Sequence, residues 1–330
     1  MPKTTPAPRR AVLGAVGGLA LAVPRRLGAQ GDAWPTRPVR VVVPFPPGGL
    51  VDTLARAVSQ HLSAALGQPV VVENRAGAGG NIGADVVAKA APDGHTLLAS
   101  SLGPIAVNQY IYRSMPYDTR TAFAPIVLLA ATPKVMCVAN ARPWRTVQDV
   151  IGEAKARPGQ LTAGSAGPGS SLHLALELFK RVTGTDIQHV PYRGAAPAVT
   201  DLVAGQIDML IDNVPNILGQ IRGAAVRPLA VATERRLPQL PEVPTMAEQG
   251  LDFVFGTAFG LVAPSGTPPA IVERIAAAVT AALREPEIGG RLVEQGAILG
   301  GGTPAQFAAL IERERSLLEP VIRAANIRAE

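Results

Sequence analysis

Two glycine-rich segments lie between a predicted strand and a predicted helix, where backbone amides can bind an anion. The first, PFPPGGLVD at residues 44–52, follows an apolar run that reads as a strand. Amides at the N-terminus of the next helix, together with the helix dipole, favour a negative charge, and glycines let a ligand approach closely. For this motif alone, an ordinary tight turn is the alternative. The carboxylate in the first helical turn could cap free amides. The expected participants are Phe45, Pro47, Gly48, Gly49 and Asp52.

The second segment, GSAGPGSSLH at residues 164–173, repeats the order of strand, glycine loop and helix. Its serines add hydroxyl donors to the same amide geometry. Ligands of open α/β sheets lie beyond the carboxyl ends of the strands, so two facing lobes would place both loops across one cleft. The expected participants are Ser165, Gly167, Gly169, Ser170 and Ser171.

A third segment, NRAGAGGNIG at residues 74–83, resembles a dinucleotide-binding fingerprint but does not fulfil it. With Gly77 and Gly79 as the first pair, the third glycine should stand at Ile82. No acidic residue ends the next predicted strand, 95–101, which finishes in serines, of which Ser101 is a candidate contact. We therefore expect no nucleotide cofactor, and interpret the segment as a flexible turn at the rim of the cleft in which Asn81 caps the next helix.

No Arg or Lys lies within the first two glycine motifs. The nearest in sequence, Arg56 and Arg75, fall outside both. A carboxylate would then be neutralised by helix N-termini, hydroxyls and water, or by a distant cation such as Arg193.

Residue patterns typical of enzymes are missing from the sequence. There is no G-x-S-x-G nucleophile motif, and the single cysteine, Cys137, lies in an apolar run typical of a buried side chain. Asp208 and Asp212 could form a carboxylate pair, although Asp212 could equally cap a loop. We expect no metal, because the histidines lack metal-ligand spacing; they are His61, His95, His173 and His189.

The positive charge of the chain belongs to its first residues. Of 31 basic residues, five lie within residues 1–29, which hold no acidic residue. The remainder is close to neutral and has no basic cluster for nucleic acid. Residues 1–29 read as a signal peptide of twin-arginine type, with Arg9 and Arg10 before a short apolar run and cleavage after Ala29. We expect a periplasmic protein, soluble after cleavage.

Short β-rich runs alternate with amphipathic helical runs from residue 39 onward, a pattern typical of an α/β fold. Strands are expected at 39–45, 69–74 and 95–101, and a second series begins after residue 139. Two such series and a return to helices at the end predict two lobes, each a mostly parallel sheet flanked by helices. Lobe 1 is expected at 35–135 and 260–330 and lobe 2 at 136–259, with crossings near Pro133 and at 256–259.

The chain resembles the Bug proteins, the extracytoplasmic receptors of tripartite tricarboxylate transporters. The resemblance rests on WPTRPVRVVVPFPPGG, VVENRAGAGGNIGADVVAKAAPDGHTLL, LTAGSAGPGSSLHLALELFK, HVPYRG, AGQIDMLIDN, LPEVPTMAEQG and FGLVAPSGTP. It implies a Venus-flytrap periplasmic-binding-protein fold, transport rather than catalysis, and a ligand carboxylate held largely by amides and ordered water from the two loops. It also implies integral membrane transporter subunits as partners.

Two positions depart from the family's pattern. Pro47 stands where Ala or Gly is common and has no N–H to donate, and His95 replaces a tyrosine. The ligand class stays open among di-, tri- and aromatic carboxylates. A doubly wound reductase or hydrolase, and a receptor that feeds a signalling sensor, are the alternative functions.

Overall fold

One mixed sheet organises the residues that the computed structural model describes, which are 1–5, 34–294 and 296–329. The strand order is β2-β1-β3-β9-β4-β7-β5-β6, with β10 and β8 also paired to β4. The strands are β1 (Val39–Val43), β2 (Val70–Asn74), β3 (Thr96–Ser101), β4 (Phe123–Ala139), β5 (Thr162–Ser165), β6 (Gln188–Pro191), β7 (Met209–Asn213), β8 (Val226–Val231), β9 (Gly256–Pro264) and β10 (Ile298–Gly301).

Helices cover the sheet between and after these strands. They are α1 (Leu50–Leu66), α2 (Asn81–Ala88), α3 (Asn108–Ile111), α4 (Val147–Ala156), α5 (Ser171–Thr183), α6 (Ala195–Val203), α7 (Val214–Arg222), α8 (Pro269–Leu283), α9 (Pro286–Glu294) and α10 (Pro304–Ala324), with short helical turns η1 (Ala78–Gly80), η2 (Gly103–Val107) and η3 (Ala247–Gln249).

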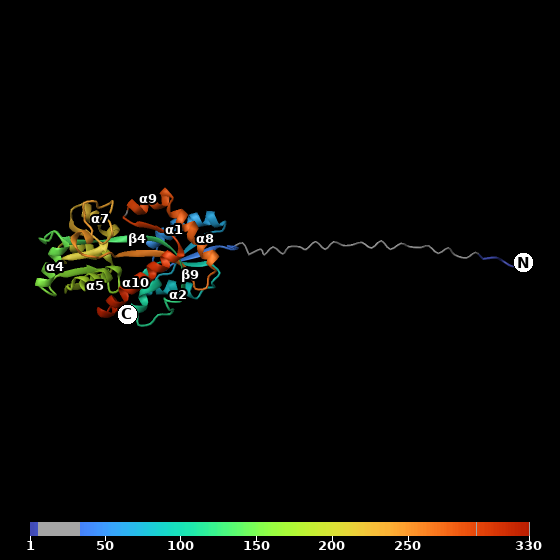
Figure 1. Cartoon of the computed structure of the whole chain (residues 1–330), viewed down its shortest axis with the longest axis horizontal. Helices are drawn as coiled ribbons and strands as arrows, with labels where there is room; N and C mark the ends of the chain where they lie inside the picture. Colours follow the sequence, from blue (N-terminus) through green and yellow to red (C-terminus); the bar gives the residue numbers. More distant parts are fainter. Residues whose placement is uncertain (6–33, 295, 330) are drawn as a thin grey trace. The chain divides into compact units, whose positions relative to one another are not determined.

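Strand β4 connects the two lobes of the α/β fold (Figure 1). From Phe123 to Pro133 it pairs with β9, and from Lys134 onward it pairs with β7 and β8. The sheet is mixed: β1 pairs in parallel with β2 and β3, and β5 with β6 and β7, whereas β9 and β4 run antiparallel to their neighbours. A continuous strand through a proline was not anticipated from the sequence, nor were α9 and β10.

Each lobe buries its own apolar layer. Helix α1 packs on β1, β2 and β3, and α8 packs on β4, β10 and α1, through side chains such as Leu54, Val58 and Ile275. On the other lobe, α6 and α7 cover β7 through Leu202 and Ile217. The 3.6-residue spacing of these apolar side chains explains why the segments form helices with one buried face.

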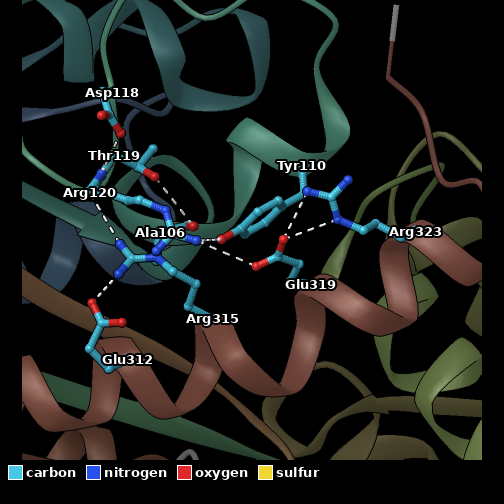
Figure 2. A network of polar contacts seen from close by, with 9 residues as sticks. All are labelled: Ala106, Tyr110, Asp118, Thr119, Arg120, Glu312, Arg315, Glu319 and Arg323. Atoms are coloured by element: carbon cyan, nitrogen blue, oxygen red, sulfur yellow. Dashed lines mark hydrogen bonds and ion pairs between the residues drawn. The ribbon is translucent and has the colours of Figure 1, made fainter.

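Helix α10 is fixed to the segment that precedes β4 by a polar network (Figure 2). The Arg120 guanidinium donates to the Tyr110 hydroxyl at 2.9 Å and also contacts Glu319 of α10. Arg315, which is 4 % exposed, donates to the carbonyl of Thr119 at 3.2 Å. These bonds fix α3 and the segment before β4 to α10.

A capping box opens α4. Thr146 accepts from the amide of Asp149, whose carboxylate accepts from the amide of Thr146. The predicted signal peptide, by contrast, lies almost entirely outside the described residues. Among the helices of the described part, none combines the length and apolar character needed to cross a membrane.

Candidate ligand-binding cavity

A cavity of about 460 Å³ opens where β1 and β3 end and β9 begins, against the N-termini of α1 and α5. Most of its wall is apolar, and Asp52 is the one charged side chain among the described residues that line it. The apolar side chains of the wall are Phe45, Leu50, Val51, Leu102, Pro104, Val107, Ile111, Tyr112, Pro168, Ala258, Phe259, Leu318 and Ala329.

The N-terminus of α1 presents free amides to this cavity. Its N-cap residue, Gly49, has no side chain to cap them, and amides of a first helical turn have no acceptor within the helix. Leu50 and Val51, at the first two helical positions, both line the cavity. These amides are therefore available to donate to an anion.

Asp52 acts as the expected cap rather than as a free charge. Its carboxylate accepts from the amide of Gly48 at 3.0 Å, from Arg56 at 3.0 Å and from Asn74 at 2.9 Å. Burial raises the pKa of Asp52, but these hydrogen bonds outweigh it, so the pKa lies below its ordinary value. Asp52 is thus ionised, and the donors around it compensate its negative charge.

The N-terminus of α5 faces the same cavity. Ser170 is its N-cap, and its hydroxyl oxygen accepts from the amide of His173 at 3.3 Å. A hydroxyl that accepts in this way keeps its own proton, so Ser170 can still donate to a ligand. Gly169 and Ser171 line the cavity beside it.

Two stacked histidines form hydrogen bonds with the glycine loop that precedes α5. The rings of His173 and His189 lie 3.8 Å apart, and His173 Nδ1 accepts from the amide of Gly169 at 3.1 Å. His189 Nε2 contacts the Ser165 hydroxyl at 2.5 Å. Burial, reinforced by charge repulsion from His189 and Lys180, lowers the pKa of His173 to about 4. The rings are therefore neutral at pH 7 and serve as hydrogen-bonding supports.

The third glycine loop also reaches the cavity, but the predicted helix cap is wrong. Gly80 is the N-cap of α2 and no side chain caps it. Asn81 is buried, and its Oδ1 accepts instead from Asn108 Nδ2 at 2.6 Å and from Tyr117 at 3.3 Å. Asn108 itself lines the cavity, so Asn81 supports the wall from behind.

A polar cluster at the junction of β4, β7 and β9 was not predicted. Asn213 Oδ1 accepts from Thr132 at 3.2 Å, from Lys134 at 2.9 Å and from Thr257 at 3.0 Å. Lys134 also donates to Ser171 at 3.2 Å. Because Ser171 and Thr257 line the cavity, a lysine distant in sequence lies next to the second glycine loop, whereas the example of a distant cation expected from the sequence is Arg193. One signal existed: a lone lysine in an apolar strand must be paired when buried.

Half of the predicted contact residues line the cavity and half do not. Lining positions are Phe45, Gly49, Asp52, Ser101, Gly169, Ser170 and Ser171. Outside the lining are Pro47, Gly48, Asn81, Ser165, Gly167, Arg193 and Asp212.

Several of the residues outside the lining have identifiable local roles. Ser165 is fully buried and bonds to the amide of Gly167, which fixes the shape of the loop. Arg193 is exposed after β6. Asp212 accepts from Asn213 and from Asn216, as the loop-cap interpretation anticipated.

The alternative of a carboxylate pair at Asp208 and Asp212 has no support in the contacts. Asp208 accepts from the amide and hydroxyl of Thr162 and pairs with Arg142. Within residues 1–5, 34–294 and 296–329, no group of three or more His, Cys, Asp or Glu side chains could hold a metal ion.

The chain is similar to known proteins. A family model described as "Tripartite tricarboxylate transporter family receptor" matches residues 54–327. The chain is 39% identical to Protein BugT of Bordetella pertussis over 88% of its length and 90% of that protein.

Solved structures are similar as well. Rpa4515 of R. palustris with adipate is 40% identical with a TM-score of 0.75, covering 90% of this chain and 100% of that one. MatC from Rhodopseudomonas palustris with bound malate is 35% identical with a TM-score of 0.72, covering 88% and 100%.

Proposed function

Because the chain belongs to the receptor family of the tripartite tricarboxylate transporters, we propose that it captures a small carboxylate in the cavity between its lobes. The family is one of solute-binding receptors rather than enzymes. One observation carries the proposal: residues at the N-termini of α1 and α5, which the proposed division assigns to different lobes, line one cavity. Two helix N-termini favour a negatively charged ligand.

The lining supports a carboxylate that has an apolar body. Hydroxyl and amide groups lie at the ends of the helices, whereas Phe45, Tyr112 and Phe259 offer aromatic surface. Adipate and malate are the ligands of two similar proteins, and a di-, tri- or aromatic carboxylate is the class proposed for this one.

Closure of the lobes would complete the site. The proposed lobes are 35–135 with 260–330, and 136–259, and the strands that join them are β4 and β9. The pairing of β4 with β9 ends at Pro133 opposite Gly256, which supports a hinge there. Small-angle scattering should record compaction when a tight carboxylate is added; an unchanged radius of gyration at saturation argues against closure.

The captured ligand would be handed to membrane transporter subunits in the periplasm, to which the predicted signal peptide would direct the chain. N-terminal sequencing of the periplasmic fraction should find a chain that lacks about its first 29 residues. A chain that keeps Met1 and sediments with membranes would contradict this localisation.

The experiment that tests capture is direct. Protein isolated from the periplasm should carry an unmodified small carboxylate, visible by native mass spectrometry and displaced on unfolding. Calorimetric titration with adipate, malate and benzoate should then give saturable binding by at least one. If the isolated protein is empty and no carboxylate binds, the proposed function is wrong.

A further inference from the structure

Lys134 is a buried cation directly behind the cavity wall. It is fully buried in β4, and its ammonium donates to Asn213 Oδ1 at 2.9 Å and to Ser171 Oγ at 3.2 Å. The ring of Phe255 lies 5.8 Å from Nζ. Ser171 alone of these contacts lines the cavity, at the first residue of α5.

We infer that Lys134 supplies the positive charge for a bound carboxylate and that the Ser171 hydroxyl transmits it to the ligand. This inference rests on the proposed function, and it assigns the selectivity of the cavity for an anion to Lys134. A hydroxyl has one proton and two lone pairs. Ser171 accepts from Lys134 with a lone pair, so its proton is free to donate into the cavity. A donor polarised by a cation forms the stronger, charge-assisted kind of hydrogen bond.

The ammonium of Lys134 has no direct counter-charge. Among the described residues, no carboxylate oxygen lies within 4.0 Å of Nζ. The acids that face it at longer range are Asp212 of β7 and Glu314 of α10. The two oxygens of Asp212 are not directed to Nζ: Oδ1 accepts from Asn213 and Asn216, and the buried Oδ2 has no hydrogen-bond partner. A ligand carboxylate at Ser171 would therefore meet a cation that is only partly compensated.

The titration of this cluster gives the inference a pH signature. Burial lowers the pKa of Lys134 to about 8, while Asp212 and Glu314 act to raise it. Burial likewise raises the pKa of Glu314 to about 7, against the lowering effects of Arg313 and Lys134. A bound carboxylate favours the charged lysine, so binding stabilises the protonated state. Affinity should then fall as the pH rises through about 8.

The experiment compares Lys134→Met, Ser171→Ala and the double variant by calorimetric titration with adipate, malate and benzoate, and with the neutral methyl esters of these acids. Each single variant should bind the carboxylates about tenfold or more weakly, since hydrogen bonds with a charged partner are the strong ones. Ester binding should change little. The double variant should bind no more weakly than Lys134→Met, because both changes interrupt the same path.

Two controls separate a charge effect from a fold effect. Lys155→Met removes an exposed cation of α4 outside the cavity lining and should leave affinity unchanged. Lys134→Arg should recover part of the lost affinity. If Lys134→Met fails to fold, Ser171→Ala still tests the inference. The wild-type protein should lose carboxylate affinity between pH 7 and pH 9, and Ser171→Ala should lose much less over the same range.

The outcomes distinguish this inference from the proposed function. Full carboxylate affinity in Lys134→Met, or in Ser171→Ala with an unchanged pH profile, overturns the role of Lys134 and leaves the receptor function standing. Equal losses for acids and esters also overturn it, since they indicate a packing effect. Failure of every carboxylate to bind the wild-type protein overturns both.

Discussion

The backbone amide of Gly169 donates to Nδ1 of His173 at 3.1 Å, so a ring of α5 fixes the loop that forms one side of the cavity. This bond requires an unprotonated Nδ1. The stability of the loop is therefore linked to the neutral state of His173, and acid should weaken it.

The pH dependence of stability follows with a defined sign. Burial, the main cause, lowers the pKa of His173 from 6.5 to about 4, so between these values the unfolded chain binds a proton that the folded protein does not. The free energy of unfolding should fall as the pH drops from about 6.5 to 4, by up to about 3 kcal/mol. Urea unfolding at several pH values measures this.

A matched variant isolates the contribution of His173. Asparagine can still accept from Gly169 but does not titrate, so His173→Asn should have a shallower loss of stability below pH 6.5. Parallel pH profiles of the two proteins would show that other groups cause the loss.

Replacing Ser170 should affect ligand and helix together. Ser170→Ala removes a donor at the cavity and the N-cap of α5, so we expect roughly ten- to hundredfold weaker carboxylate binding and about 1 kcal/mol lower stability. Thr146→Ala removes the N-cap of α4, which does not line the cavity, and should lower stability without changing affinity. Calorimetry and thermal unfolding together test the pair.

Two adjacent glycines should respond differently to a side chain. Gly49 has φ −74°, and an added Cβ would meet only Pro46 O, at 3.9 Å. Gly49→Val should therefore fold normally but bind carboxylate more than tenfold more weakly, because its side chain would shield the amides. Gly48 has φ +87°, so Gly48→Ala should cost about 1–3 kcal/mol of stability instead. The opposite pattern would place the ligand away from α1.

Arg193 should have no part in binding. It is exposed and outside the cavity lining, so Arg193→Ala should bind carboxylates with unchanged affinity. If this variant alone abolished binding while Ser170→Ala bound normally, a direct ion pair would hold the ligand and the helix N-termini would not.

Local patterns were sufficient to predict most of the fold. Alternating strands and amphipathic helices, and the capping motif at Thr146, depend on neighbours a few residues apart. The short strand β10 escaped prediction because its glycines carry little β signal and only its pairing with β4 defines it.

The sequence predicts the parts of the candidate site that come from one short segment. It does not predict the parts that come from residues brought together by strand pairing. Gly49 and Ser170 lie in recognisable strand-to-helix turns. Lys134, Asn213 and Thr257 meet only because β7 and β9 both pair with β4, and the hydrogen-bonded partners are 44 to 79 residues apart in sequence. Ser165 illustrates the converse: a serine in the right motif whose hydroxyl points to its own loop.

The pairing of β3 with β9 has a consequence for synthesis of the chain. Ser101 pairs with Phe259, so the ribosome must add about 160 residues after β3 before β9 exists to pair with it. At about 5–20 residues per second, that edge stays open for roughly 10–30 s. An open strand edge can pair with other chains, so intermolecular pairing at β3 competes with folding during this interval. A chain that stops before residue 256 would never complete the sheet.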